Sequence, residues 1–125
     1  MKIHYLLLLL LATGCHSTNR AMNTYGSGLF QHWTHSYEDD KDQTKVFRPS
    51  TYTFPPSRGR EGFEIKEDGT FIRYAIGPAD GTDKVNGTWK MKGKDRLIIT
   101  FGQNKVPPFE MKIISLEKAM LTIQK

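Results

Sequence analysis

Apolar and polar residues alternate with a period of two along most of this chain. From Leu29 onward, short alternating runs are separated by Gly, Pro, Asp and Asn, and apolar residues nowhere recur at spacings of three and four over a helical length. Such alternation is typical of strands with one buried face and argues against a long amphipathic helix. The pattern predicts eight strands: Leu29–Tyr37, Val46–Phe54, Gly62–Lys66, Thr70–Ile76, Lys84–Met91, Arg96–Phe101, Phe109–Leu116 and Met120–Gln124.

Short turn sequences indicate how these strands connect. Asp68-Gly69, Lys92-Gly93-Lys94-Asp95 and Glu117-Lys118 are tight enough to join sequential strands as hairpins. A series of hairpins forms a meander, and a meander of this size removes its exposed edges by closing on itself. We therefore predict an all-β fold, a small antiparallel up-and-down barrel of about eight strands, in which Met120–Gln124 pairs with the first strand around Trp33.

The Asp68-Gly69 turn allows two registers between its flanking strands. A two-residue turn gives three cross-strand pairs: Ile65 with Ile72, Phe63 with Tyr74, and Glu64 with Arg73. A three-residue turn with Gly69 in a bulge instead places Ile65 beside Phe71 and Phe63 beside Arg73. We favour the first register because it separates apolar pairs from opposite charges, although it leaves Phe71 on the outer face.

The N-terminus has the organisation of a secretory signal. A basic start is followed by leucines from Leu6 to Leu11 and then by Ala12-Thr13-Gly14-Cys15. The apolar run is far shorter than the ~20 residues that a membrane-spanning helix needs. Leu11 to Cys15 resembles the lipobox of bacterial lipoproteins, which implies that Cys15 is acylated and begins the mature chain. The alternative is an ordinary signal peptide cut nearby, which would leave a free thiol.

Three segments follow from that cleavage point. Residues 1–14 are the predicted lipoprotein signal peptide, and residues 15–28 read as a polar, flexible tether from lipidated Cys15. Residues 29–125 form the predicted barrel domain. The mature chain of 125 − 14 = 111 residues is the size of one small domain. We expect it to be monomeric.

Charge and cysteine content narrow the classes of partner. Removing Lys2 with the signal leaves 17 basic and 13 acidic residues, a surplus of +4 that favours anionic surfaces. No run of basic residues resembles a nucleic-acid-binding arm, so nucleic acid is not expected as a partner. Cys15 is the only cysteine, so a core of apolar side chains must stabilise the domain.

Several motifs together resemble a known family. Trp33, Phe63 to Phe71 and Gly87-Thr88-Trp89-Lys90 are followed by Leu97-Ile98-Ile99-Thr100 and Ile113-Ile114-Ser115-Leu116. This order is similar to the small lipocalin-like domain of bacterial lipoproteins, an antiparallel barrel of the calycin type. The resemblance implies a lipid-anchored protein of the bacterial cell envelope. Because His16 is not the acidic residue of an inner-membrane retention signal, we expect the outer membrane.

Aromatic and aliphatic residues at alternate strand positions are candidates for the barrel interior. In a barrel of about eight strands, such side chains either fill the inside or line one small ligand. These candidate ligand-lining residues are Trp33, Phe63, Ile65, Tyr74, Trp89, Leu97, Ile99 and Ile113.

The chain contains few candidates for catalysis or metal binding. His32 and His35 point to opposite faces of one strand and so cannot chelate the same ion. The acidic cluster at residues 38–42 lacks the ligand spacing of a calcium loop and reads as a solvated turn. No nucleophile elbow, triad or phosphate loop is present in the sequence. We therefore expect no metal, no cofactor and no enzymatic activity.

The stretch from Phe54 to Gly62 is the most unusual loop. Two prolines, two glycines, Arg58 and Arg60 could form an anion-recognising rim. We favour the alternative, a connector whose arginines pair with Glu61 or other nearby acids. We expect both arginines to be exposed.

These observations lead to two main functional hypotheses, and the least favoured alternative is a small-molecule enzyme that uses the barrel mouth. The first is an envelope lipoprotein that binds a small apolar or amphipathic ligand, a ligand class implied by the family resemblance. The second is a non-enzymatic interaction module with a filled barrel that contacts an envelope protein, a lipid headgroup or a polysaccharide.

Overall fold

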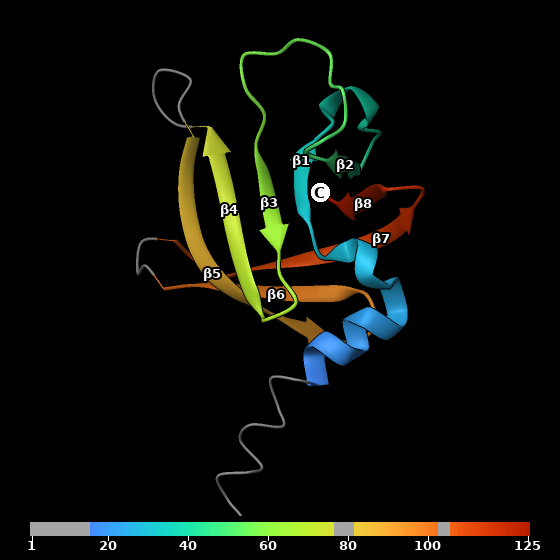
Figure 1. Ribbon diagram of the computed structural model, residues 1–125, viewed down its shortest axis with the longest axis vertical. Helices are drawn as coiled ribbons and strands as arrows, with labels where there is room; N and C mark the ends of the chain where they lie inside the picture. Colours follow the sequence, from blue (N-terminus) through green and yellow to red (C-terminus); the bar gives the residue numbers. More distant parts are fainter. Residues whose placement is uncertain (1–15, 77–81, 103–105) are drawn as a thin grey trace, which may run out of the picture.

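The computed structural model describes residues 16–76, 82–102 and 106–125, which form a closed antiparallel barrel (Figure 1). Strands occupy all eight predicted regions, and the predicted fold class is confirmed. The first strand is shorter than expected because 3-10 turns η1 (Ser27–Leu29) and η2 (Tyr37–Asp39) flank it. The second ends at Pro49, whose carbonyl accepts the Tyr52 amide at 2.9 Å in a turn. The strands are β1 (His32–His35), β2 (Thr44–Pro49), β3 (Gly62–Ile65), β4 (Thr70–Ile76), β5 (Thr82–Lys92), β6 (Arg96–Phe101), β7 (Phe109–Glu117) and β8 (Met120–Gln124).

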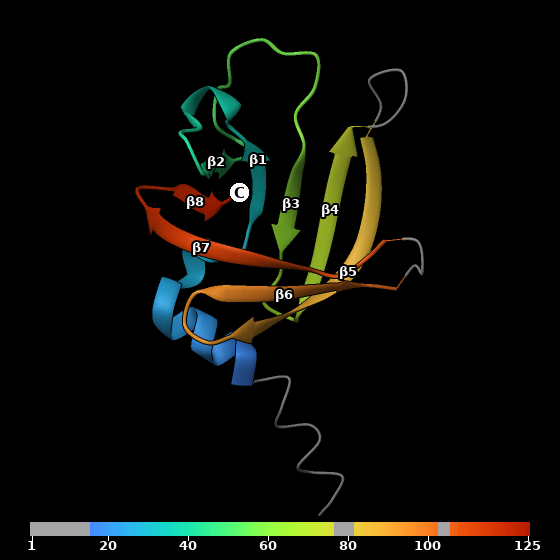
Figure 2. The same ribbon diagram turned by 180° about the vertical axis from the view of Figure 1, so that it is seen from behind.

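The strand order departs from a simple meander at one place. From β3 to β8 each strand pairs with its sequence neighbours, but β1 lies between β2 and β3. The predicted pairing of the last strand with the first is therefore wrong, since β8 pairs with β2 and Thr44 lies opposite Gln124. Because β2 and β3 are both antiparallel to β1, they run in the same direction and cannot form a hairpin. Residues 50–61 return the chain from the end of β2 to the start of β3 (Figures 1 and 2).

The register between β3 and β4 is the second of the two that the sequence allows. Ile65 lies opposite Phe71, and the favoured pairing of Ile65 with Ile72 is wrong. The amide of Lys66 donates to the Thr70 carbonyl at 3.0 Å, which leaves a three-residue loop ending at Gly69 with φ 92°. This register buries Phe71 completely. Burying a phenylalanine contributes about 2 kcal/mol, more than the exposed ion pair that the other register offered.

A helix occupies most of the segment predicted to be a flexible tether. Residues 16–25 are helical and pack on one end of the barrel (Figure 1), so the tether prediction is wrong for them. Ala21 is fully buried, and the Tyr25 hydroxyl donates to the Lys94 carbonyl at 2.9 Å. The predicted signal peptide and Cys15 lie outside the described residues. Among the described residues, no helix has the length and apolar character needed to cross a membrane.

The half of the barrel next to this helix is filled by side chains. Trp33 is fully buried and its indole N–H donates to the Leu29 carbonyl at 2.9 Å. The indole N–H of Trp89 donates to the Lys66 carbonyl at 2.8 Å. The indole N–H of each tryptophan thus has a hydrogen-bond acceptor, while its ring packs in the core. We call this half the closed end.

Candidate functional site

A pocket of about 370 Å³ opens at the end of the barrel opposite the N-terminal helix. We call this end the mouth. The strands β2 and β3 begin there, and residues 106–108 precede β7 at the same end. Apolar residues make most of the lining and charged residues the remainder. The lining residues are Lys45, Phe47, Glu61, Gly62, Phe63, Phe71, Arg73, Val106, Pro107, Pro108, Phe109, Met111 and Ile123.

Packed phenylalanines form the apolar wall of the pocket. Phe63 lies between Phe47 and Phe71, with ring centres 4.8 Å and 5.5 Å away. Phe109 makes an edge contact with Phe71 at 6.1 Å and is 38% exposed at the mouth. Such aromatic contacts hold each ring in a defined orientation. The wall is therefore preformed rather than assembled around a ligand.

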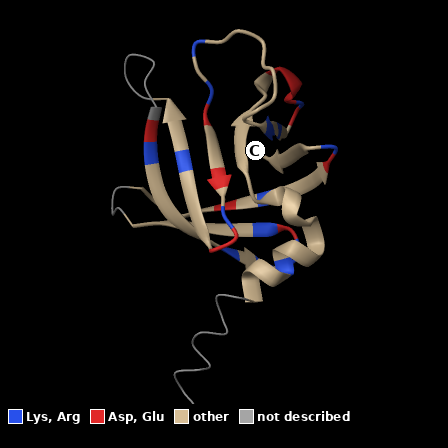
Figure 3. Cartoon of the chain, viewed as in Figure 1, with Lys and Arg blue, Asp and Glu red and all other residues tan. Residues whose placement is uncertain are grey.

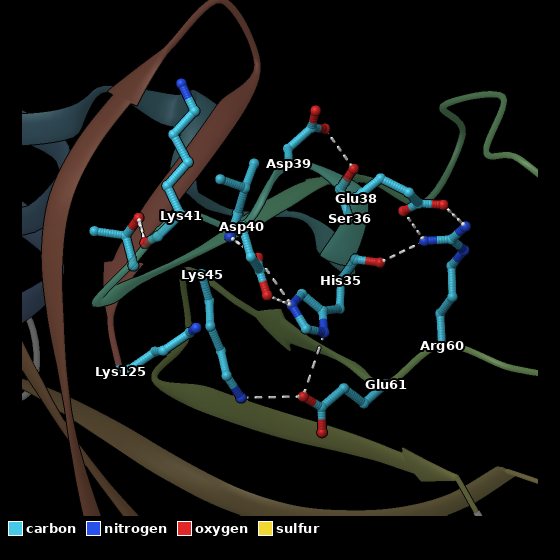
Figure 4. Close-up of polar contacts among 12 residues, drawn as sticks. His35, Ser36, Glu38, Asp39, Asp40, Lys41, Lys45, Arg60, Glu61 and Lys125 are labelled. Atoms are coloured by element: carbon cyan, nitrogen blue, oxygen red, sulfur yellow. Dashed lines mark hydrogen bonds and ion pairs between the residues drawn. The ribbon is translucent and has the colours of Figure 1, made fainter.

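A polar chain fixes one side of the mouth (Figure 4). Lys45 Nζ lies 3.4 Å from Glu61 Oε1, which in turn lies 3.5 Å from His35 Nδ1. The other ring nitrogen of His35 lies 2.9 Å from Asp40 Oδ2. Asp40 Oδ1 accepts the backbone N–H of Val46 at 2.8 Å. This series of polar contacts connects Lys45 and Glu61 to the backbone of β2, so these two charged groups are held at the pocket wall.

Arg73 is the remaining charged residue of the pocket. It lies opposite Phe63 in the β3–β4 register and is exposed to solvent. Within the described ranges it has no ion pair or hydrogen bond through its side chain. Because Lys45 is paired with Glu61, the Arg73 guanidinium supplies the unbalanced positive charge of the pocket. This geometry can hold an apolar body against the phenylalanines and an anionic group beside Arg73.

Arg60 is not available to an external anion. Its guanidinium donates to Glu38 Oε1 at 2.7 Å and to the main-chain carbonyls of His35 and Pro55 at 3.1 Å and 2.9 Å. The side chain is 8% exposed, so the predicted exposure is wrong. The hydrogen bonds from Arg60 lower the pKa of the Glu38 carboxyl to about 2. Arg60 therefore fastens the 50–61 connection to η2, and it does so through Glu38 rather than Glu61.

Arg58, the other candidate of the anion loop, is exposed. No described residue forms an ion pair or a hydrogen bond with its side chain. The structure therefore separates the two arginines: Arg60 points into the protein and Arg58 points to solvent.

The acidic cluster at residues 38–42 is more ordered than the predicted solvated turn. The Ser36 hydroxyl donates to Asp39 Oδ2 at 2.7 Å, and Arg48 Nε donates to the same oxygen at 3.1 Å. These contacts lower the pKa of Asp39, the Ser36 hydrogen bond most of all. Glu38 pairs with Arg60, and Asp40 contacts His35. Together with Asp39, three acids of the cluster therefore have a defined partner. The cluster organises the rim beside the pocket.

The eight interior candidates fall into three groups. Phe63 lines the pocket, and Tyr74 lies on the outer face, where it stacks on His32 at 4.3 Å and donates to Glu64 Oε1 at 3.1 Å. The expectation that Tyr74 faces inward is wrong, because it followed from the wrong β3–β4 register. The remaining candidates are buried in the core: Trp33, Ile65, Trp89, Leu97, Ile99 and Ile113.

Sequence reasoning missed most of the pocket. Met111 and Ile123 alternate with polar neighbours, so the signal was present for them but their depth in the barrel was not. Phe47 follows Val46 and Phe71 precedes Ile72, so the local pattern did not show which residue of each pair faces inward. Among the described residues, no group of three His, Cys, Asp or Glu side chains is placed to hold a metal ion.

Comparison with family models, with curated proteins and with solved structures finds no match to this chain.

Proposed function

We propose that this chain is an envelope lipoprotein of lipocalin-like type whose barrel mouth binds a small amphipathic molecule. The observation that carries the proposal is the mouth pocket, which combines a phenylalanine wall with an unbalanced arginine. Its volume of about 370 Å³ lies near the lower end of the range for small-molecule sites. The pocket therefore suits a small apolar body with one anionic group.

Anchoring through Cys15 is supported by the N-terminal sequence. A short apolar run ends in Leu11-Ala12-Thr13-Gly14-Cys15, and Cys15 is the only cysteine of the chain. Acylation at this position supplies the lipid that holds the barrel at a membrane, and we favour the outer membrane. Cys15→Ser should move the protein to the soluble envelope fraction or leave it unprocessed. A variant that is processed normally and stays in the membrane fraction would contradict the lipobox.

The ligand proposal can be tested with 1-anilinonaphthalene-8-sulfonate, a probe with apolar rings and one sulfonate. We expect the lipoprotein in detergent to bind it saturably, with fluorescence above that of the same detergent without protein. Met111→Trp fills the pocket and should weaken binding at least tenfold. Ile114→Trp is the matched control, because Ile114 is 49% exposed on the same strand and does not line the pocket. Both variants are checked by thermal melting.

The contribution of Arg73 is tested by changing the charge of the probe. Arg73→Gln should weaken binding of the sulfonate probe several-fold but leave binding of the neutral N-phenyl-1-naphthylamine unchanged, because only the first has an anionic group. Equal loss for both probes would show that Arg73 shapes the pocket without recognising charge. If neither probe binds saturably, or if Met111→Trp binds as the wild type does, the pocket is not a ligand site and the filled-barrel interaction module is favoured.

A further inference from the structure

Positive charge is concentrated around the β5–β6 hairpin. Arg20, Lys90, Lys92, Lys94, Arg96 and Lys112 form what we call the basic hairpin surface. Two acids, Asp95 and Glu110, lie among them, so the surface has a net charge of 6 − 2 = +4. The chain without residues 1–14 has a net charge of 17 − 13 = +4. The basic hairpin surface thus accounts for the entire surplus, and all other residues sum to zero.

The strand register makes this surface continuous. Arg96 lies opposite Lys92 on one side and Lys112 on the other. Lys90 and Lys92 alternate with the buried Trp89 and Met91, so both point outward from β5. Figure 3 shows the basic residues of β5, β6 and the N-terminal helix at the closed end, where acidic residues of the β3–β4 turn also lie.

Part of this charge has no internal partner. Glu110 pairs with Lys92 at 3.0 Å and with Arg96 at 3.2 Å, and these three side chains are 42% to 61% exposed. Lys90, Lys94 and Lys112 form no ion pair with any residue in the described ranges. Like charges brought together in this way repel one another, and an external anionic surface relieves that repulsion.

The N-terminal helix connects this surface to the proposed anchor. The Arg20 guanidinium donates to the Gly93 carbonyl, and the Tyr25 hydroxyl donates to the Lys94 carbonyl. The Thr18 hydroxyl donates to the Glu67 carbonyl at 2.8 Å. The helix is thus fastened to the turns of the closed end, and Cys15 directly precedes it in the sequence. A lipid on Cys15 would attach beside the basic hairpin surface, without a long spacer.

We infer that the basic hairpin surface lies on an anionic lipid bilayer, with the barrel mouth directed away from it. The inference rests on the proposed lipid anchor and adds an orientation to it. An acyl anchor combined with a basic surface is a stronger membrane attachment than either alone, and each basic residue near an anionic membrane strengthens binding about fivefold. The ligand pocket then faces the aqueous compartment.

The orientation can be measured on the lipidated protein in vesicles. Because acylated Cys15 has no free thiol, a cysteine introduced at Thr88 or at Gln43 is labelled alone with a fluorophore. Thr88 is exposed on β5 beside Lys90, whereas Gln43 is exposed at the mouth before β2. The vesicles contain phosphatidylcholine with or without phosphatidylglycerol, and a headgroup nitroxide quenches labels near the bilayer. We expect strong quenching at Thr88 only, and only with phosphatidylglycerol present.

Charge variants distinguish the basic hairpin surface from general attraction. Lys90, Lys94 and Lys112 changed together to Gln should reduce quenching at Thr88 to the level at Gln43, as should 0.5 M salt. The matched control changes three exposed lysines elsewhere, Lys41, Lys84 and Lys125, to Gln and should leave quenching unchanged. Equal quenching at the two labels, or equal effects of the two triple variants, would overturn the orientation while the anchor stands. A protein that does not float with the vesicles at all would overturn both.

Discussion

Substitution of Arg60 tests how the connection between β2 and β3 is held in place. Its guanidinium donates to the carbonyls of His35 and Pro55, and it lies 4.5 Å from the ring centre of Tyr37 and 4.8 Å from that of Phe54. Arg60→Ala removes all four contacts and leaves two main-chain carbonyls without a protein donor. We therefore expect a clear loss of stability, although the residue lies in a loop.

The size of the effect follows from these contacts. A hydrogen bond to a carbonyl contributes about 1 kcal/mol net, and a cation–π contact near the surface contributes about 0.5 kcal/mol. Arg60→Ala should lower the free energy of unfolding by about 3 kcal/mol, without counting the solvent-exposed Glu38 pair. With a urea dependence of about 1.5 kcal/mol per molar, the unfolding midpoint should fall by about 2 M.

Arg58 provides the matched control in the same loop. Its side chain is exposed and forms no hydrogen bond with the described residues, so Arg58→Ala should change stability by less than about 0.5 kcal/mol. Arg60→Lys keeps the charge but loses the planar donor fork, and should recover less than half of the loss. Equal urea midpoints for Arg58→Ala and Arg60→Ala would refute the structural role assigned to Arg60.

Three further predictions concern the barrel. Phe71→Ala should cost about 3–5 kcal/mol in urea unfolding, whereas Ile72→Thr on the outer face should cost less than about 1 kcal/mol; the reverse order would restore the other register. Gly87→Ala should destabilise the barrel because its Cβ would lie 2.6 Å from a β6 carbonyl, while Gly102→Ala meets nothing within 4 Å and should melt as the wild type does. In the folded protein the pKa of Glu38 is about 2, against an ordinary 4.5, so its contribution to stability is present above pH 4.5 and disappears as the pH falls towards 2. Glu38→Gln should therefore reduce the change in urea unfolding midpoint between pH 5 and pH 2. A variant whose midpoint changes with pH as much as the wild type's would contradict this.

The strands could be predicted because their signal is local. Alternation of apolar and polar residues with Gly, Asp and Asn between runs located β4, β6 and β8 at their observed bounds. Each of these strands buries one face, so the sequence itself records the period. The short, polar turn between β5 and β6 also marked that hairpin correctly.

Features that depend on distant residues could not be predicted in the same way. The position of β1 between β2 and β3 reverses the usual pairing of sequential strands, and no local signal reports it. The helix at residues 16–25 buries Ala21 completely, too sparse a pattern to show a helical period. The β3–β4 register depended on whether burial of Phe71 outweighs an exposed charge pair, which only the closed barrel settles. The favoured register paired Arg73 with Glu64 on the outer face, so the position of Arg73 in the pocket was not predicted.

The position of β1 also sets the order in which the barrel can form as the chain folds. The hairpin of β1 and β2 can form early. The other edge of β2 has no partner until β8 is available, because Thr44 of β2 pairs with Gln124 of β8. Closing a loop of this length is slow, and an open strand edge is a site of aggregation in the meantime. Chains truncated before Met120 should therefore be substrates for chaperones or proteases, so that only the complete barrel accumulates.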